Sequence, residues 1–230
     1  MKTTTAPAAP ATKKTAAPRP RARAARDSKE LLLGIAAKLF REKGYAGTSV
    51  RDIVKKARIE PSALYYHYAS KEALLDAVLE RSIQGVMGEV HAAVDQLPEA
   101  APPRERIAAA IAAHLRAISV HGDFALASRR VVGEVPLAVR RKHDSMRAEY
   151  GAYWQSLLTA AAEGAAVRDD APLGLARMFL IGALNWSSEW YDPRRKTPEQ
   201  MALVFTRMLF EGMGAAAQSR PTARPRAPSR

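Results

Sequence analysis

The sequence contains no cysteine, which excludes disulfide bonds, thiolate-bound zinc, iron–sulfur clusters and cysteine nucleophiles. It also lacks a run of roughly 18 apolar residues, the length that a membrane-spanning helix needs. No apolar segment follows the N-terminal lysines, as a secretory signal would require. The 230 residues are 47% hydrophobic and 26% charged, so the chain can fold around a core. We therefore expect a cytoplasmic protein without a membrane partner.

Motifs of catalytic and metal sites are missing as well. The chain has no G-x-S-x-G, no glycine-rich phosphate loop, no H-E-x-x-H and no calcium-binding loop. Glu89, His91 and Asp95 lie close in sequence, but three ligands at one exposed helix end would make a poor metal site. We therefore predict no catalytic residue, no metal site, no cofactor and no enzymatic activity.

Acidic residues are absent from both ends of the chain. The first 26 residues carry seven Lys and Arg and no acid, and residues 215–230 carry four Arg and no acid. Their Ala, Pro and Arg bias lacks apolar periodicity, which predicts disordered basic arms over 1–25 and 215–230. Residues 27–71 hold nine bases against five acids, whereas 72–214 hold sixteen against eighteen. This distribution indicates a small polyanion-binding unit joined to a nearly neutral domain.

Between the arms, apolar residues recur at helical spacing and no segment alternates as a strand does, which predicts an all-α fold. Asp27 or Ser28 is expected to cap the first helix and Gly44 to end it in the left-handed conformation. Thr48 and Ser70 are expected to cap later helices. Breaks at proline, glycine and aspartate place five further helices at about 104–120, 123–133, 136–164, 172–191 and 198–214.

Residues 49–68 contain two short helical segments separated by a few residues, the spacing of a helix-turn-helix motif. The second segment, from Pro61 to Tyr68, would be the helix that enters the major groove of DNA. Its small residues come first, and three polar-tipped aromatics follow: Tyr65, Tyr66 and His67. A buried helix would have to satisfy each of these polar groups, whereas phosphates and bases supply partners directly.

The run LFREKGYAGTSVRDIVKKARIEPSALYYHYASKEALLDAV, within an ungapped match over 26–86, resembles the DNA-binding domain of TetR-family transcriptional regulators. The resemblance implies a three-helix domain at 26–86 and a larger helical effector-binding and dimerisation domain at 87–214. It implies double-stranded operator DNA as partner, with phosphates contacted by Thr48, Arg51, Tyr66, His67 and Lys71, and bases faced by Ser62, Ala63 and Tyr65. Arg58 departs from the family pattern, which usually has a turn glycine there.

The segment LIGALNWSSEWYDPRRKTPEQMA, residues 180–202, resembles a subgroup whose members often sense acyl-CoA thioesters. Apolar and polar positions suggest an effector site of unknown ligand, with acyl-CoA as a lead: Phe124, Arg129, Arg130, Tyr150, Trp154 and Phe179. Faces on the last two helices would suit a homodimer interface, with intramolecular core as the alternative: Met178, Ile181, Asn185, Trp186, Phe205 and Met208.

Taken together, these patterns predict a homodimeric repressor that a small-molecule effector releases from a palindromic operator. Two alternatives stay open. An architectural DNA-binding protein without an effector would show the same basic charge, and an activator would share the fold. The ratio of affinities for operator and random DNA separates a regulator from an architectural protein.

Overall fold

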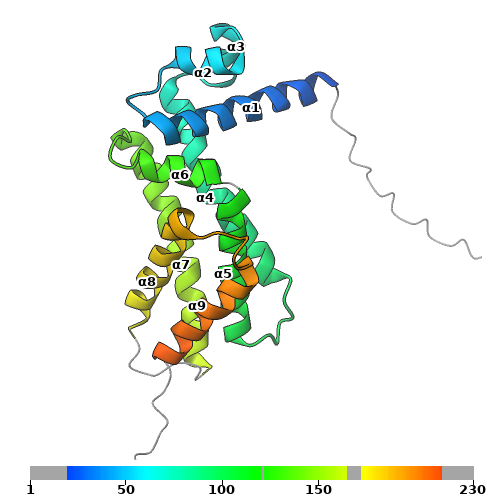
Figure 1. The fold of residues 1–230 in the computed structure, drawn as a ribbon, viewed down its shortest axis with the longest axis vertical. Helices are drawn as coiled ribbons and strands as arrows, with labels where there is room; N and C mark the ends of the chain where they lie inside the picture. Colours follow the sequence, from blue (N-terminus) through cyan, green and yellow to red (C-terminus); the bar gives the residue numbers. More distant parts are fainter. Residues whose placement is uncertain (1–19, 121, 165–171, 214–230) are drawn as a thin grey trace, which may run out of the picture.

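The computed structural model describes residues 20–120, 122–164 and 172–213, and this part of the chain forms nine helices and no strand (Figure 1). The predicted all-α class is confirmed. The predicted arm segments 1–19 and 215–230 lie outside the described residues. The helices are α1 (Pro20–Lys43), α2 (Val50–Ala57), α3 (Pro61–His67), α4 (Lys71–Asp95), α5 (Pro103–Val120), α6 (Gly122–Arg130), α7 (Leu137–Glu163), α8 (Leu173–Trp190) and α9 (Pro198–Met213).

The start of α1 differs from the prediction. The helix begins at Pro20, so residues 20–25 are helical and neither Asp27 nor Ser28 is its cap. Alanine and arginine are strong helix formers, and they extend the helix through a segment whose composition alone suggested disorder. The end of α1 is as predicted, because Gly44 adopts φ +75° and its N–H donates to the Phe40 carbonyl oxygen at 2.9 Å.

The turn between α2 and α3 contains the one non-glycine residue with positive φ among the described residues. Arg58, the C-cap of α2, has φ 55° and ψ 45°, and its N–H donates to the carbonyl oxygens of Lys55 and Val54. Arginine therefore adopts the left-handed conformation at the position where the family usually has glycine, and the turn geometry is preserved.

Replacing Arg58 with glycine should stabilise the protein. A left-handed residue with a Cβ costs about 1–2 kcal/mol, and glycine removes this cost. Glycine also raises the conformational entropy of the unfolded chain, which lowers stability by about 0.5–1 kcal/mol. The expected net gain is about 0.5–1 kcal/mol in the free energy of unfolding, measured by urea titration. Lys56→Gly, two residues earlier inside α2, should instead destabilise by about 1 kcal/mol. A loss of stability in Arg58→Gly would contradict this reading of the turn.

Two hydrophobic cores are connected by α4, which runs through both. Its first half packs against α1 and α6 in the N-terminal core, and its second half packs against α5 and α7 in the C-terminal core. As predicted, the Ser70 side chain caps α4 by accepting from the N–H of Ala73 at 3.1 Å. The apolar side of α6 and the turn after it, which the sequence assigned to the second domain, lies in the N-terminal core: Ala127, Val131 and Val135.

None of the helices in the described ranges has both the length and the apolar character needed to cross a membrane.

Candidate DNA-binding surface and effector cavity

The recognition helix α3 is anchored on one side and exposed on the other. Leu64 is fully buried and fixes the helix against the N-terminal core. On the opposite side Tyr65 is 52% exposed and Tyr66 is 79% exposed, and the Tyr66 and His67 rings meet edge to face at 5.0 Å between centroids. Ser62 and Ala63 are also exposed. The α3 residues expected to face DNA are therefore exposed, on a helix that lies at one end of the molecule (Figure 1).

The helix before α3 is held by a capping box. Ser49, and not Thr48 as the sequence suggested, is the N-cap: its hydroxyl accepts from the N–H of Asp52, and the Asp52 carboxylate accepts from the N–H of Ser49 at 2.9 Å. Hydrogen bonds from the Ser49 side chain and backbone lower the pKa of Asp52 to about 2. Arg51, in the first turn of α2, is exposed and free to reach a phosphate.

Two predicted phosphate contacts have other roles. Thr48 is only 1% exposed, and its hydroxyl donates to the carbonyl oxygens of Gly44 at 2.8 Å and Leu39 at 3.3 Å. Lys71 donates from Nζ to the carbonyl oxygens of Tyr45 and Thr48, each at 2.9 Å. Both side chains therefore hold the segment between α1 and α2 in place, Thr48 from within the segment and Lys71 from the start of α4.

A cavity of about 400 Å³ lies between α4, α5, α6, α7 and α8. Its wall is mostly apolar, with a few polar groups, as small-molecule sites usually are. Sequence reasoning identified Arg129 and Tyr150 but missed most of the lining, because apolar spacing along one helix does not show which neighbouring helix each of its sides faces. The main contributors are Ser82, Ile83 and Val86 from α4, Ile118 from α5, Ala125 from α6, Arg147 from α7 and Ile181 from α8.

The polar centre of the cavity is a buried hydrogen bond. His114 Nδ1 and the Tyr150 hydroxyl lie 2.8 Å apart. Burial lowers the pKa of His114 to about 4, so the imidazole is neutral near pH 7. Burial also raises the pKa of the Tyr150 hydroxyl above its ordinary value of 10.0. Both groups are therefore uncharged. They can form a hydrogen bond with a ligand, but they add no charge–charge attraction.

Four predicted effector residues lie elsewhere. Phe124 packs against the N-terminal core, and Trp154 is fully buried in the C-terminal core. Arg130 is exposed and lines no part of the cavity, and Phe179 is 69% exposed on α8. Arg129 does line the cavity, but its guanidinium is paired with the Glu189 carboxylate. Of the six predicted effector residues, Arg129 and Tyr150 line the cavity and the other four do not.

Comparison with known proteins agrees with this architecture. Residues 32–78 match the family described as "Bacterial regulatory proteins, tetR family", and residues 100–213 match "Tetracyclin repressor-like, C-terminal domain". The chain belongs to the TetR family. It is 27% identical to the transcriptional repressor KstR2 of Rhodococcus jostii over 186 residues, which cover 80% of this chain and 90% of the relative.

Solved TetR-family structures have the same arrangement of helices. PfmR of Thermus thermophilus is 26% identical with a TM-score of 0.70, and the match covers 80% of this chain and 99% of PfmR. KstR2 of Mycobacterium tuberculosis is 25% identical with a TM-score of 0.70, and the match covers 80% of this chain and 94% of that structure. These relatives are transcriptional regulators, so at the level of the family the chain is a regulator and not an enzyme.

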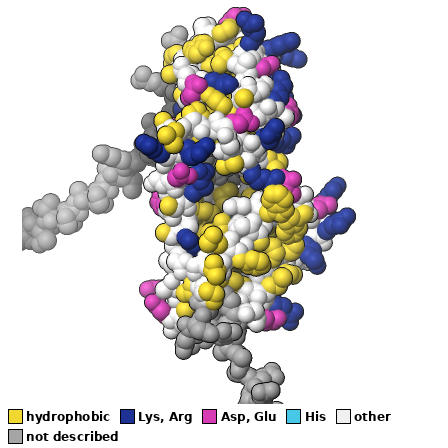
Figure 2. Space-filling view, turned by 90° about the vertical axis from the view of Figure 1, so that its left-hand side faces the viewer, with side chains coloured by type: hydrophobic (Ala, Val, Ile, Leu, Met, Phe, Trp, Pro, Cys, Tyr) yellow, Lys and Arg dark blue, Asp and Glu magenta, His cyan; other side chains and the backbone are white. Residues whose placement is uncertain are grey.

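In this TetR-family chain, α8 and α9 expose a broad apolar face. Trp186 is 58% exposed and Met208 is 60% exposed, and they lie with other exposed side chains: Leu175, Met178, Phe179, Leu203 and Val204. Figure 2, which looks at the side on which α8 lies in Figure 1, shows hydrophobic side chains gathered over the lower half of the molecule. Contiguous exposed apolar surface of this kind marks an interaction site.

Two of the residues predicted for the interface also line the cavity. Ile181 and Asn185 lie on the side of α8 that lines it. Phe205 is half-buried and packs against the C-terminal core and the Trp190 ring, so it lies at the edge of the exposed face. The exposed face therefore consists of the residues on the outer sides of α8 and α9.

The turn after α6 connects the cavity with the DNA-binding domain, a contact that no sequence motif indicated. Glu134 accepts from the N–H of Ala46 through Oε2 at 2.6 Å. A Cβ on Gly44 would lie 2.7 Å from Glu134 Oε1, so glycine at this position permits the close approach. At the start of α6, Asp123 pairs with Arg41 at 2.5 Å. Movement of α6 would therefore be transmitted to the segment that precedes the helix-turn-helix motif.

Proposed function

We propose that this protein is a homodimeric repressor that leaves a palindromic operator when a small-molecule effector occupies the cavity between α4 and α8. The observation that supports this proposal is that α6 and the turn after it contact both the cavity and the DNA-binding domain. Ala125, Ser128 and Arg129 line the cavity, while Glu134 in the turn after α6 holds Ala46. The repressor names of the KstR2 relatives support repression over activation.

The mechanism that fits this arrangement is a two-state equilibrium. In one state the two recognition helices of the dimer lie about one DNA turn apart, about 34–36 Å. In the other, α4 and α6 are displaced by the ligand and the spacing no longer matches. A ligand shifts this equilibrium only as far as it prefers the second state, and DNA weakens ligand binding by the same factor.

The effector proposed here is an amphiphile with an apolar body, with acyl-CoA as the class that the resemblance of residues 180–202 suggests. The cavity supports an apolar body through Ile83, Val86 and Ile118, and burial of such groups is worth about 25 cal/mol per Å². The neutral pair of His114 and Tyr150 offers a hydrogen bond to a carbonyl group.

The test measures binding to DNA from beside the protein's own gene by fluorescence anisotropy, with a scrambled duplex as reference. A regulator should prefer its site by about 10³-fold or more. Long-chain acyl-CoA, free fatty acid and a neutral aromatic compound are then titrated into the complex. Release by acyl-CoA at micromolar concentration supports the proposal, and release by the neutral compound alone rejects the acyl-CoA class.

A cavity variant makes this test specific. Ala125→Phe places a ring at the cavity wall and should abolish release while operator affinity is kept. Ala138→Phe makes the same change at an exposed site on α7 and should respond like the wild type. Equal release from both variants would place the effector outside this cavity. A ratio of affinities near one for operator and random DNA would instead favour the architectural alternative.

A further inference from the structure

A second cavity of about 320 Å³ adjoins the first, between α4, the turn after α6 and the first turns of α7. Ser128, Val132 and Arg147 line both cavities, so the two share a wall. The character of the second cavity is different, because α7 contributes two arginines and a histidine to it: Arg140, His143 and Arg147.

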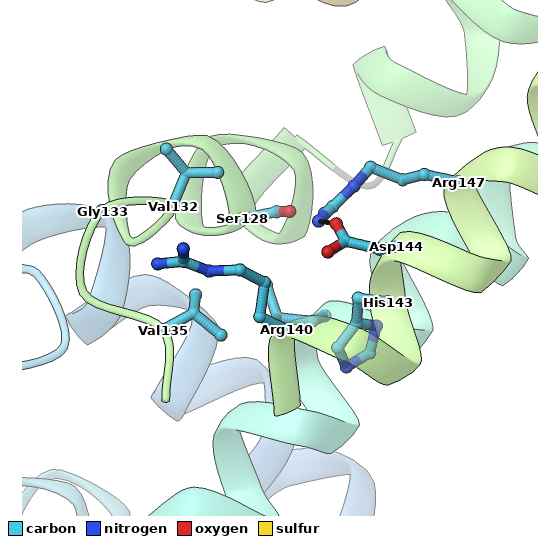
Figure 3. A pocket seen from close by; sticks show the side chains of 9 residues that line it. Ser128, Val132, Gly133, Val135, Arg140, His143, Asp144 and Arg147 are labelled. Atoms are coloured by element: carbon cyan, nitrogen blue, oxygen red, sulfur yellow. Dashed lines mark hydrogen bonds and ion pairs between the residues drawn. The ribbon is translucent and has the colours of Figure 1, made fainter. Parts of the chain in front are cut away.

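The charges in this cavity are only partly balanced. Arg147 pairs with Asp144 at 2.6 Å, and Figure 3 shows these two side chains together beside Ser128. Arg140 reaches toward the turn at Val132 and Gly133 in the same view. Within the described ranges no carboxylate pairs with Arg140. The cavity therefore holds one uncompensated positive charge next to a neutralised pair.

His143 adds unused polar capacity to the wall. The ring is 1% exposed, and its Nε2 lies 2.8 Å from Asp76 Oδ1 on α4. Its Nδ1 is buried and finds no hydrogen-bond partner in the described part of the chain. The Nε2 contact holds His143 against α4, so the positive charge that faces the cavity is that of Arg140.

We propose that this cavity is an anion subsite, which binds the phosphate-bearing head group of the amphiphile whose apolar body fills the first cavity. The inference rests on the proposed effector role of that first cavity. A volume of 320 Å³ corresponds to about ten water molecules at about 30 Å³ each. The cavity therefore has room for a head group larger than a carboxylate. The fork of an arginine guanidinium suits phosphate oxygens through paired hydrogen bonds.

The position of the subsite gives the head group a part in regulation. Glu134, which holds the N–H of Ala46, lies between two residues of the cavity wall, Gly133 and Val135. A phosphate drawn toward Arg140 would therefore press on the turn that contacts the DNA-binding domain. The apolar body and the head group both contribute to affinity, and the head group also causes the displacement of the turn.

The test compares octyl phosphate with 1-octanol, two ligands of equal tail length, by calorimetric titration of the full-length protein without DNA. The wild type should bind octyl phosphate at least about tenfold more tightly, since hydrogen bonds to charged groups add this much or more. Arg140→Gln should remove most of that preference and leave 1-octanol binding unchanged. Arg140→Lys keeps the charge without the fork and should give an intermediate value.

The control is Arg141→Gln, which removes the same charge from an exposed neighbour that does not line the cavity. If both Gln variants lose the preference for octyl phosphate equally, general electrostatic attraction and not a specific site explains it, and the subsite is overturned. Equal binding of both ligands by the wild type would overturn the subsite and leave the apolar cavity standing. Binding of neither ligand would reject both cavities, and operator binding by the same preparation would show whether the regulator itself survives.

Discussion

Replacing Met208 with aspartate is expected to yield a folded monomer whose operator affinity falls by at least about a thousandfold, the usual margin between specific and non-specific binding. Met208 is exposed on the outer side of α9, so the monomer can hydrate the new carboxylate. In the proposed dimer the same carboxylate would be buried without a partner, which costs about 3–5 kcal/mol. One recognition helix alone reads too few bases, because TetR-type sites are read as two half-sites.

Sedimentation velocity measures the association state, and circular dichroism checks that helical content is kept. Leu137→Asp is the matched control, because Leu137 is a similarly exposed apolar residue at the start of α7, away from α8 and α9. An acid in the first turn of a helix is also well tolerated. If Met208→Asp stays dimeric while folded, the interface lies on another face of the molecule.

The double variant Tyr66→Phe with His67→Ala is expected to lower affinity for operator and random DNA alike, by about ten- to a hundredfold. The resemblance assigns these side chains to phosphates, and phosphate contacts carry no sequence information. Tyr66 is 79% exposed and contacts His67, so loss of its hydroxyl leaves the core intact. Anisotropy titrations at ~0.15 M salt on both duplexes measure the effect.

Tyr68→Phe provides the control for this experiment. It deletes the same hydroxyl two residues further on, where the ring is buried and the hydroxyl donates to the Lys29 carbonyl oxygen at 3.4 Å. DNA affinity should be unchanged there and stability slightly lower. Wild-type affinity in the Tyr66/His67 variant would mean that α3 does not bind in the DNA major groove as a helix-turn-helix motif requires.

Local signals in the sequence were sufficient for most helix boundaries and for the exposed α3. Helical spacing, Pro61 at the start of α3 and Gly44 at the end of α1 all depend on near neighbours, and the structure bears them out. Thr48 and Ser49 differ by a single position, and only the reciprocal bond to Asp52 decides which of them is the cap. The cap of α2 was therefore predictable to within one position, whereas the start of α1 was not.

The cavity could not be predicted in the same way, because its lining depends on how five helices cross. The sequence assigned Ile181 and Trp186 to the same predicted interface, yet Ile181 lines the cavity, whereas Trp186 is exposed and has the Arg129 guanidinium over its ring. Glu134 has no sequence signature at all, since its partner is a backbone N–H 88 residues away. Long-range packing, not local preference, determines these positions.

The packing of α6 against the N-terminal core limits how such regulators can be recombined. A chimera joined at residue 86 would separate the DNA-binding domain from Ala127, Val131 and Val135, which fill the space between α1 and α4. The transplanted domain would expose that apolar surface, and its new partner would bring an α6 shaped for another domain. A functional exchange of DNA specificity in this protein should therefore graft α2 and α3 alone, or move α6 and its following turn together with the first four helices.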